Sequence, residues 1–141
     1  MPLDWRSRFV ADDGLELQPP AGEDDVRAAE AALAVMFPTE LRELYRVSNG
    51  VFDGPGQWFV VWPLADVVAH NRADWSDAVG DSQRLQLVGF GDDGAGAPFC
   101  VSRSGRAGVF VWSALDDEAV LLADTLVEFW TRWQADSLPR Y

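Results

Sequence analysis

Residues 85–112 read LQLVGFGDDGAGAPFCVSRSGRAGVFVW and predict a run of three β-strands. The apolar parts of this stretch are rich in β-branched and aromatic residues, which favour strands, and glycine, serine or proline separates them. Ser104-Gly105, with the glycine before Val109, is typical of a hairpin turn. We therefore expect neighbouring strands to pair antiparallel. The three predicted strands are Leu85 to Phe90, Ala97 to Ser102 and Gly108 to Trp112.

Two helices are predicted earlier in the chain. Over Glu23 to Met36, apolar residues recur at three- and four-residue steps, which is typical of an amphipathic helix. Pro38 ends this helix, and Thr39 is expected to cap a second one that stops at Asn49-Gly50. We expect the two helices to lie antiparallel. The apolar residues of their faces are Val26, Ala29, Leu33, Leu41, Leu44 and Tyr45.

Shorter elements are predicted between these helices and the strands. Gln57 to Trp62 is β-branched and aromatic and predicts a buried strand, whereas Phe52 to Gly56 before it predicts a turn-rich loop. A short third helix is expected from Leu64 towards Asn71. A polar connection then covers residues 72–84, and Val120 to Leu122 predicts a further edge strand.

The two ends of the chain complete the predicted fold. Residues 1–21 form a lead-in segment compatible with a short helix, and Asp124 is expected to cap a final helix followed by a tail over residues 136–141. Strands gathered between terminal helices, without strict alternation, indicate an α+β class. We expect one domain over residues 1–141, with a largely antiparallel, twisted sheet of about four to six strands and the terminal helices packed on it. The buried stripe of the final helix is Leu126, Phe129, Trp130 and Trp133.

The charge balance excludes some classes of partner. The chain of 141 residues carries 23 acidic and 11 basic residues, a formal net charge of −12, and every basic residue is arginine. Such a negative field repels phosphate backbones and anionic membranes, so we expect no direct contact with nucleic acid or membrane. It attracts a basic protein partner and speeds their encounter. The alternative is that the acidity serves only solubility.

The sequence favours a cytoplasmic protein. Its first residues lack the basic start and apolar run of a secretion signal, and no stretch approaches the length of a membrane span. The single cysteine, Cys100, cannot form an internal disulfide, which fits a reducing compartment. The oligomeric state is left open.

Candidate catalytic groups are few. His70 follows Asp66 by four residues on the predicted third helix, so the two could form an acid–base pair, although a surface contact is the favoured interpretation. Cys100 lies within a predicted strand and is interpreted as a small buried apolar residue rather than a nucleophile. We therefore expect no enzyme activity, no cofactor and no transition-metal site.

The glycine-rich stretch Gly89 to Gly94 matches the spacing of a dinucleotide-binding loop. Such a loop must be followed by a helix whose N-terminus faces the phosphates. Here Asp92 and Asp93 occupy variable positions, and Pro98 with a strand follows instead of a helix. The stretch is interpreted as a turn, and a loose cation site at the two aspartates is the alternative.

The order of these features resembles the SUKH superfamily, which includes the fungal Smi/Knr cell-wall regulators and many bacterial immunity proteins. No one motif is specific, and the resemblance rests on their order and spacing over about residues 22–133. The motifs are Phe37-Pro38-Thr39-Glu40-Leu41, Ser48-Asn49-Gly50, Pro63-Leu64-Ala65-Asp66-Val67, the glycine-rich stretch from Val88 to Gly96, Val109-Phe110-Val111-Trp112 and the closing helix from Leu126 to Phe129.

The resemblance implies an α+β fold and, in bacteria, a protein that binds and inhibits a cognate toxin, commonly a nuclease or a deaminase. It implies no catalytic residues. A regulatory scaffold that binds an endogenous protein, as the fungal relatives suggest, is the alternative function, and a small enzyme built on Asp66 and His70 is a third.

Partner contacts are predicted at acidic and aromatic residues near loops. For the tryptophans among them, packing in the core is the alternative interpretation. The candidates are Asp53, Trp58, Trp75, Asp92, Asp93, Asp116 and Asp117.

Overall fold

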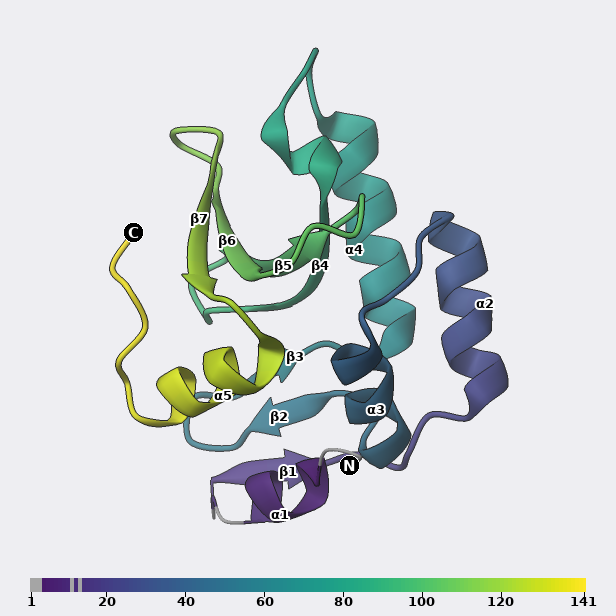
Figure 1. Cartoon of the computed structure of the whole chain (residues 1–141), viewed down its shortest axis with the longest axis vertical. Coiled ribbons are helices and arrows are strands. Elements are labelled where there is room, and N and C mark those ends of the chain that lie inside the picture. Colours follow the sequence, from purple (N-terminus) through teal and green to yellow (C-terminus); the bar gives the residue numbers. More distant parts are fainter. Residues whose placement is uncertain (1–3, 11, 13) are drawn as a thin grey trace.

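A seven-stranded antiparallel sheet forms the centre of the structure, and its strands lie side by side in chain order (Figure 1). The computed structural model describes residues 4–10, 12 and 14–141. Each strand pairs antiparallel with the next, which confirms the pairing expected from the turns. The strands are β1 (Leu15–Leu17), β2 (Val51–Asp53), β3 (Trp58–Val61), β4 (Leu87–Asp92), β5 (Pro98–Ser102), β6 (Val109–Ser113) and β7 (Glu118–Ala123).

Two short strands raise the strand number above the expected four to six. The loop predicted over Phe52 to Gly56 is wrong in its first part, because Val51–Asp53 forms β2. Its backbone is paired on both sides, with Leu17 of β1 opposite Val51 and Trp58 of β3 opposite Asp53. A strand of three residues is stabilised by such neighbours rather than by its own composition.

The sheet bends between β3 and β4. Figure 1 shows β1 to β3 crossing the lower part of the view while β4 to β7 run upright. The two parts meet where Val61 pairs with Gly91. A Cβ atom on Gly91 would lie 1.8 Å from the carbonyl oxygen of Val60, so only glycine allows this close approach.

The described residues form five α-helices and a short 3-10 helix beside the sheet, and two helix ends differ from the expectation. The first long helix stops at Leu33 because Ala34 turns into the left-handed region at φ 54°. The third helix does not stop near Asn71 but continues to Asp77, into the predicted connection. None of the helices in the described residues is both long and apolar enough to cross a membrane. The helices are α1 (Trp5–Val10), α2 (Glu23–Leu33), α3 (Thr39–Val47), α4 (Leu64–Asp77), η1 (Gln83–Gln86) and α5 (Leu126–Gln134).

Helix packing and capping also correct the sequence-based prediction. Helix α2 lies along α4 rather than chiefly along α3 (Figure 1). Thr39 is the first helical residue of α3, with Pro38 in the cap position. At α5 the cap is Thr125 instead of Asp124: the Thr125 hydroxyl accepts from the Glu128 N–H at 3.1 Å. The Glu128 carboxylate in turn accepts the N–H of Asp124, the residue before the cap, at 3.2 Å.

The terminal helices pack together against the sheet. Phe129 of α5 meets Phe99 of β5 edge to face, with ring centroids 4.8 Å apart. The next residue, Trp130, packs edge to face on Trp5 of α1 at 6.5 Å. All four rings are buried. Aromatic packing therefore joins both ends of the chain to one core, and the α+β class with helices at both ends is confirmed.

Candidate partner-binding site

The predicted contact residues lie in two groups at opposite ends of β4. Asp53 and Trp58 face each other across β2 and β3, and the Trp58 indole N–H donates to the Asp92 carbonyl at 3.1 Å, at the end of β4. Asp93 follows in the turn. Trp75 instead donates to the Leu87 carbonyl at the start of β4, at 3.0 Å. Asp116 and Asp117 lie near that end, in the turn between β6 and β7.

Asp92 connects the first group of contact residues, at the end of β4, through its hydrogen bonds. One of its carboxylate oxygens accepts from the Gly94 N–H at 2.7 Å, and the other accepts from the Trp62 indole at 3.0 Å. Together with its carbonyl bond to Trp58, this residue holds two tryptophans and its own turn. Gly94, at φ +84°, lies directly against the Trp58 ring. The glycine-rich stretch therefore acts as a support for Trp58, and β5 rather than a helix follows it.

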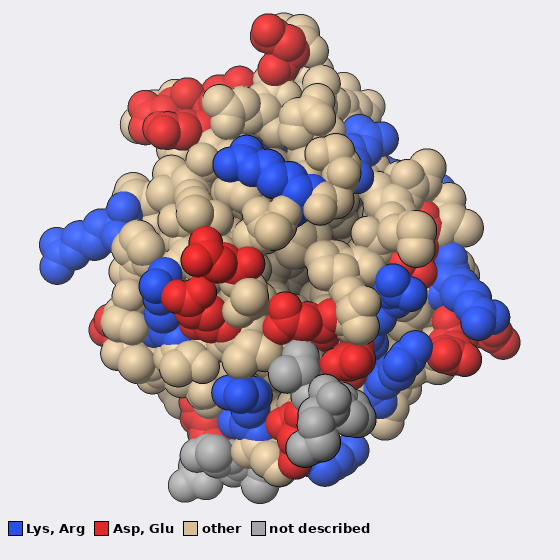
Figure 2. All heavy atoms as spheres, in the orientation of Figure 1, with Lys and Arg blue, Asp and Glu red and all other residues tan. Residues whose placement is uncertain are grey.

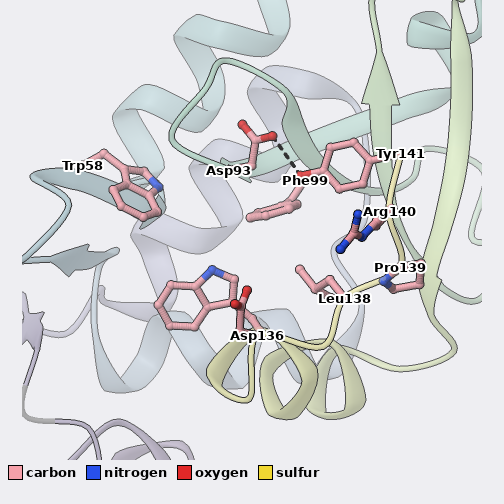
Figure 3. Close-up of a pocket in the computed structure, with 9 residues that line it drawn as sticks. Trp58, Asp93, Phe99, Asp136, Leu138, Pro139, Arg140 and Tyr141 are labelled. Atoms are coloured by element: carbon pink, nitrogen blue, oxygen red, sulfur yellow. Dashed lines mark hydrogen bonds between the residues drawn. The ribbon is translucent and has the colours of Figure 1, made fainter.

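Asp93 has one oxygen committed to the turn and one directed outward. Its Oδ1 accepts from the N–H groups of Ala95 and Ala97, at 2.8 and 3.0 Å. Its Oδ2 accepts from the Tyr141 hydroxyl at 2.8 Å, a bond drawn in Figure 3. Burial and this bond to Asp93 raise the pKa of Tyr141. The carboxylate is therefore held in a set orientation and faces the end of the chain.

A pocket of about 580 Å³ opens between the first group and the C-terminal segment (Figure 3). Its walls combine four aromatic rings with two carboxylates, and residues 138–141 close one side. Of the residues predicted as partner contacts, Trp58 and Asp93 line this pocket. Its other lining residues were not predicted, since nothing in the sequence pattern indicates where residues 138–141 fold back. The lining residues are Trp58, Asp93, Phe99, Trp133, Asp136, Leu138, Pro139, Arg140 and Tyr141.

Trp133 is the member of this pocket that the helix pattern came closest to identifying. The α5 stripe was expected to bury it, but the structure leaves it half-buried, stacked on Trp130 with centroids 5.0 Å apart. One ring face is thus occupied by the core. An aromatic residue at the end of a buried stripe lies at the position where a helix passes from the core to the surface.

In the second group of contact residues, Asp117 joins the turn between β6 and β7 to the segment before η1. Asp117 Oδ1 accepts from the Trp112 indole at 3.0 Å and from the Ser82 hydroxyl at 2.8 Å. These bonds, that of Trp112 first, hold the pKa of Asp117 below its usual range. Trp75 is half-buried, with the Arg103 guanidinium 3.9 Å above its ring. Asp116 is exposed.

A second pocket, of about 410 Å³, lies between the β5–β6 loop and the starts of α3 and α5. In Figure 2 this face of the molecule is hollowed near its centre, and acidic side chains border the lower side of the hollow. Glu40 and Asp124 are among its lining residues, and Glu40 accepts from the Val127 N–H at 3.2 Å. None of the predicted contact residues lines it.

The two residues considered for catalysis, His70 and Cys100, pack against other side chains rather than forming a catalytic pair. The His70 ring lies against the Trp62 indole, with centroids 4.3 Å apart, rather than against Asp66. Cys100 is buried in β5, and burial raises the pKa of its thiol to about 12. Within the described residues, no group of three or more His, Cys, Asp and Glu side chains is arranged to hold a metal ion.

Comparison with models of protein families identifies the family of this chain. No curated protein matches the chain at a significant level. The model of the SMI1 / KNR4 family (SUKH-1) matches residues 20–132, from the approach to α2 to the last turns of α5. The match includes the whole glycine-rich turn and Trp58, and it stops before Trp133. Because it spans most of the 141 residues, the chain belongs to the SMI1 / KNR4 family (SUKH-1).

Proposed function

We propose that this protein is an immunity protein, which binds a cognate bacterial toxin in the cytoplasm and neutralises it by occupying its surface. The observation that carries the proposal is membership of the SUKH-1 family combined with a net charge of −12. Bacterial proteins of the superfamily that the sequence resembles commonly inhibit nucleases and deaminases. A toxin that acts on nucleic acid needs a basic surface, and an acidic inhibitor is complementary to it.

The chemistry of the described surface supports binding rather than turnover. The carboxylates of Asp92 and Asp93 accept hydrogen bonds from their own turn, and that of Asp117 accepts from the Trp112 indole. His70 packs on an indole. The pocket beside Trp58 offers aromatic area and negative charge. Aromatic anchors surrounded by charge are typical of protein interfaces, where a few buried rings carry most of the affinity.

Co-expression with the product of the neighbouring gene tests the proposal. We expect that product to be toxic alone, and harmless and co-purifying when this protein is present. In an assay of the purified toxin, inhibition should be complete at one equivalent of this protein, because a stoichiometric inhibitor does not turn over. The association rate should fall by about tenfold or more as salt is raised.

Three outcomes contradict the proposal. Complete inhibition at a small fraction of one equivalent would indicate an enzyme that inactivates the toxin. A neighbour that is bound but harmless would favour the regulatory scaffold, and a neighbour that is neither toxic nor bound would remove the basis for immunity.

A further inference from the structure

The pocket beside Trp58 is closed on one side by residues 138–141, here called the strap. Helix α5 ends at Gln134, and Ser137 still donates its N–H to the Arg132 carbonyl at 2.8 Å. Beyond it, no backbone hydrogen bond joins the strap to any residue that the structure describes. It is held by the partly buried Leu138 and by the Tyr141 hydroxyl on Asp93. A segment with so few bonds opens at low free-energy cost.

The strap places an arginine in an acidic, aromatic pocket. Figure 3 shows the Arg140 side chain directed toward the interior of the pocket, with Asp93 and Asp136 on other walls. None of these three charged groups has an ion-pair partner within 4.0 Å among the described residues. The pocket therefore has negative charge that its own arginine does not pair with directly.

The walls have the chemistry that binds a guanidinium group. Trp58 and Trp133 supply partly exposed ring surface, on which a planar cation stacks favourably, and the buried Phe99 forms an apolar wall behind it. Asp93 supplies a carboxylate whose orientation is already set by two turn N–H groups, so that binding costs little ordering. A phosphate or an acidic side chain would be repelled by the same carboxylates.

We propose that this pocket receives an arginine side chain of the protein partner, and that Arg140 and Tyr141 of the strap occupy the position until the partner displaces them. The inference rests on the proposed function for the identity of the partner, but the pocket can be tested without it. The strap also lies outside residues 20–132, the part that matches the family. The pocket thus combines residues from the matched part, such as Trp58 and Asp93, with strap residues outside it.

The strap lowers the apparent affinity of the pocket. A ligand that binds only the open form has its affinity reduced by the fraction of molecules that are open. Replacing Arg140 by Gln removes the guanidinium that competes for the pocket, and replacing Tyr141 by Phe removes the hydrogen bond that ties the strap to Asp93. Both changes leave the ring surfaces and the carboxylates of the pocket in place. Both changes should therefore strengthen binding of an external arginine.

The test is a nuclear magnetic resonance titration of the full chain with the blocked peptide acetyl-Gly-Arg-Gly-amide. We expect the indole N–H signals of Trp58 and Trp133 to shift saturably, and the citrulline analogue, which is neutral, to leave them unchanged. The lysine analogue should bind more weakly, because its ammonium does not stack as a planar group. Arg140→Gln and Tyr141→Phe should each tighten binding by about threefold or more.

The charge variants give matched controls. Asp93→Asn and Asp136→Asn should each weaken binding by about two- to fivefold, as expected for a partly exposed ion pair. Asn at position 93 keeps the oxygen that accepts the turn N–H groups, and Asp136 is exposed, so both variants should fold. Asp116→Asn removes the same charge from the exposed turn between β6 and β7 and should leave the affinity unchanged.

Three results would overturn the inference. These are equal binding of the citrulline peptide, no gain from Arg140→Gln, or equal losses in Asp93→Asn and Asp116→Asn. With a toxin in hand, an affinity insensitive to Asp93→Asn and Asp136→Asn would refute the arginine pocket and leave the immunity function standing. If the peptide binds as expected but no toxin does, the pocket stands and the immunity function fails.

Discussion

The guanidinium of Arg84 donates to the side-chain oxygen of Asn71 at 2.8 Å, and both residues are buried. The same Asn71 oxygen accepts from the Gly89 N–H, and its amide donates to the Gly89 carbonyl, both at 2.8 Å. Arg84 also pairs with Asp74 at 3.0 Å and donates to Leu87. One amide thus joins α4, η1 and β4.

Replacing Asn71 by Leu should destabilise the fold by about 2–4 kcal/mol, because Arg84 and both backbone groups of Gly89 would lose a partner in the core. Urea unfolding measures the change. Arg72→Met, at the neighbouring exposed position, should cost less than about 0.5 kcal/mol. Similar costs at the two positions would show that the buried network contributes little.

Two glycines of β4 should differ in their tolerance of a methyl group. In Gly91→Ala the new Cβ would lie 1.8 Å from the Val60 carbonyl oxygen, so β3 and β4 must separate. In Gly89→Ala the nearest atom, on the Trp62 ring, lies at 3.1 Å, and a side chain can shift. We expect a loss of about 3 kcal/mol or more for Gly91→Ala and about 1 kcal/mol for Gly89→Ala in urea unfolding. Equal losses would contradict the close approach.

Asp117→Asn should alter the dependence of stability on acid. Hydrogen bonds from Trp112 and then Ser82 lower the pKa of Asp117 in the folded state. The ionised carboxylate therefore stabilises the fold above its ordinary pKa of 3.8, and this contribution is lost as the pH falls through and below that value. The variant should be less stable than the wild type at neutral pH, with the difference shrinking in acid.

Urea unfolding across the pH range measures this difference for Asp117. Asn accepts the same hydrogen bonds without charge assistance and tolerates the positive φ of 50° at this position. Asp116→Asn, one residue earlier and exposed, is the matched control for net charge. A constant difference between wild type and Asp117→Asn at every pH would count against the role of the ionised form.

Cys100 should react with thiol reagents only when the protein opens. Burial raises its pKa to about 12, so almost no thiolate forms at neutral pH, and the side chain is inaccessible in β5. Reaction with a disulfide reagent should be slow in buffer and fast in denaturant. Ser102→Cys adds a thiol at a half-buried position of the same strand and should give one fast equivalent beside the slow one. Fast modification of Cys100 in the native wild type would show that the thiol is accessible without opening of the fold.

Local patterns were sufficient for much of the fold. The strands β3, β4, β5, β6 and β7 were predicted within a few residues, because their β-branched and aromatic runs are bounded by glycine, proline or serine. β2 was missed, since Val51–Asp53 stands between turn residues and forms a strand only where two neighbours pair with it. Whether a segment forms a strand therefore depends on the neighbouring strands as much as on its own sequence.

The end of α4 was missed for a related reason. After Asn71 the helix is polar, and its buried face consists of hydrogen-bonding groups rather than apolar ones. Asn71, Asp74 and Trp75 each bond to β4 or to Arg84. The spacing of apolar residues does not predict a helix face that is stabilised by hydrogen bonds.

The sequence by itself determined the α+β class, the antiparallel order of the strands, the excess of negative charge and the family, because composition and short-range spacing carry these properties. Only the tertiary structure decided what the candidate residues do. It brings Trp58, Asp93 and Tyr141 together from three distant parts of the chain. It also commits the carboxylates of Asp92 and Asp117 to hydrogen bonds from the indoles of Trp62 and Trp112. Side-chain hydrogen bonds and the path of the strap depend on which segments meet in space, and that information lies in long-range packing rather than in any local run of residues.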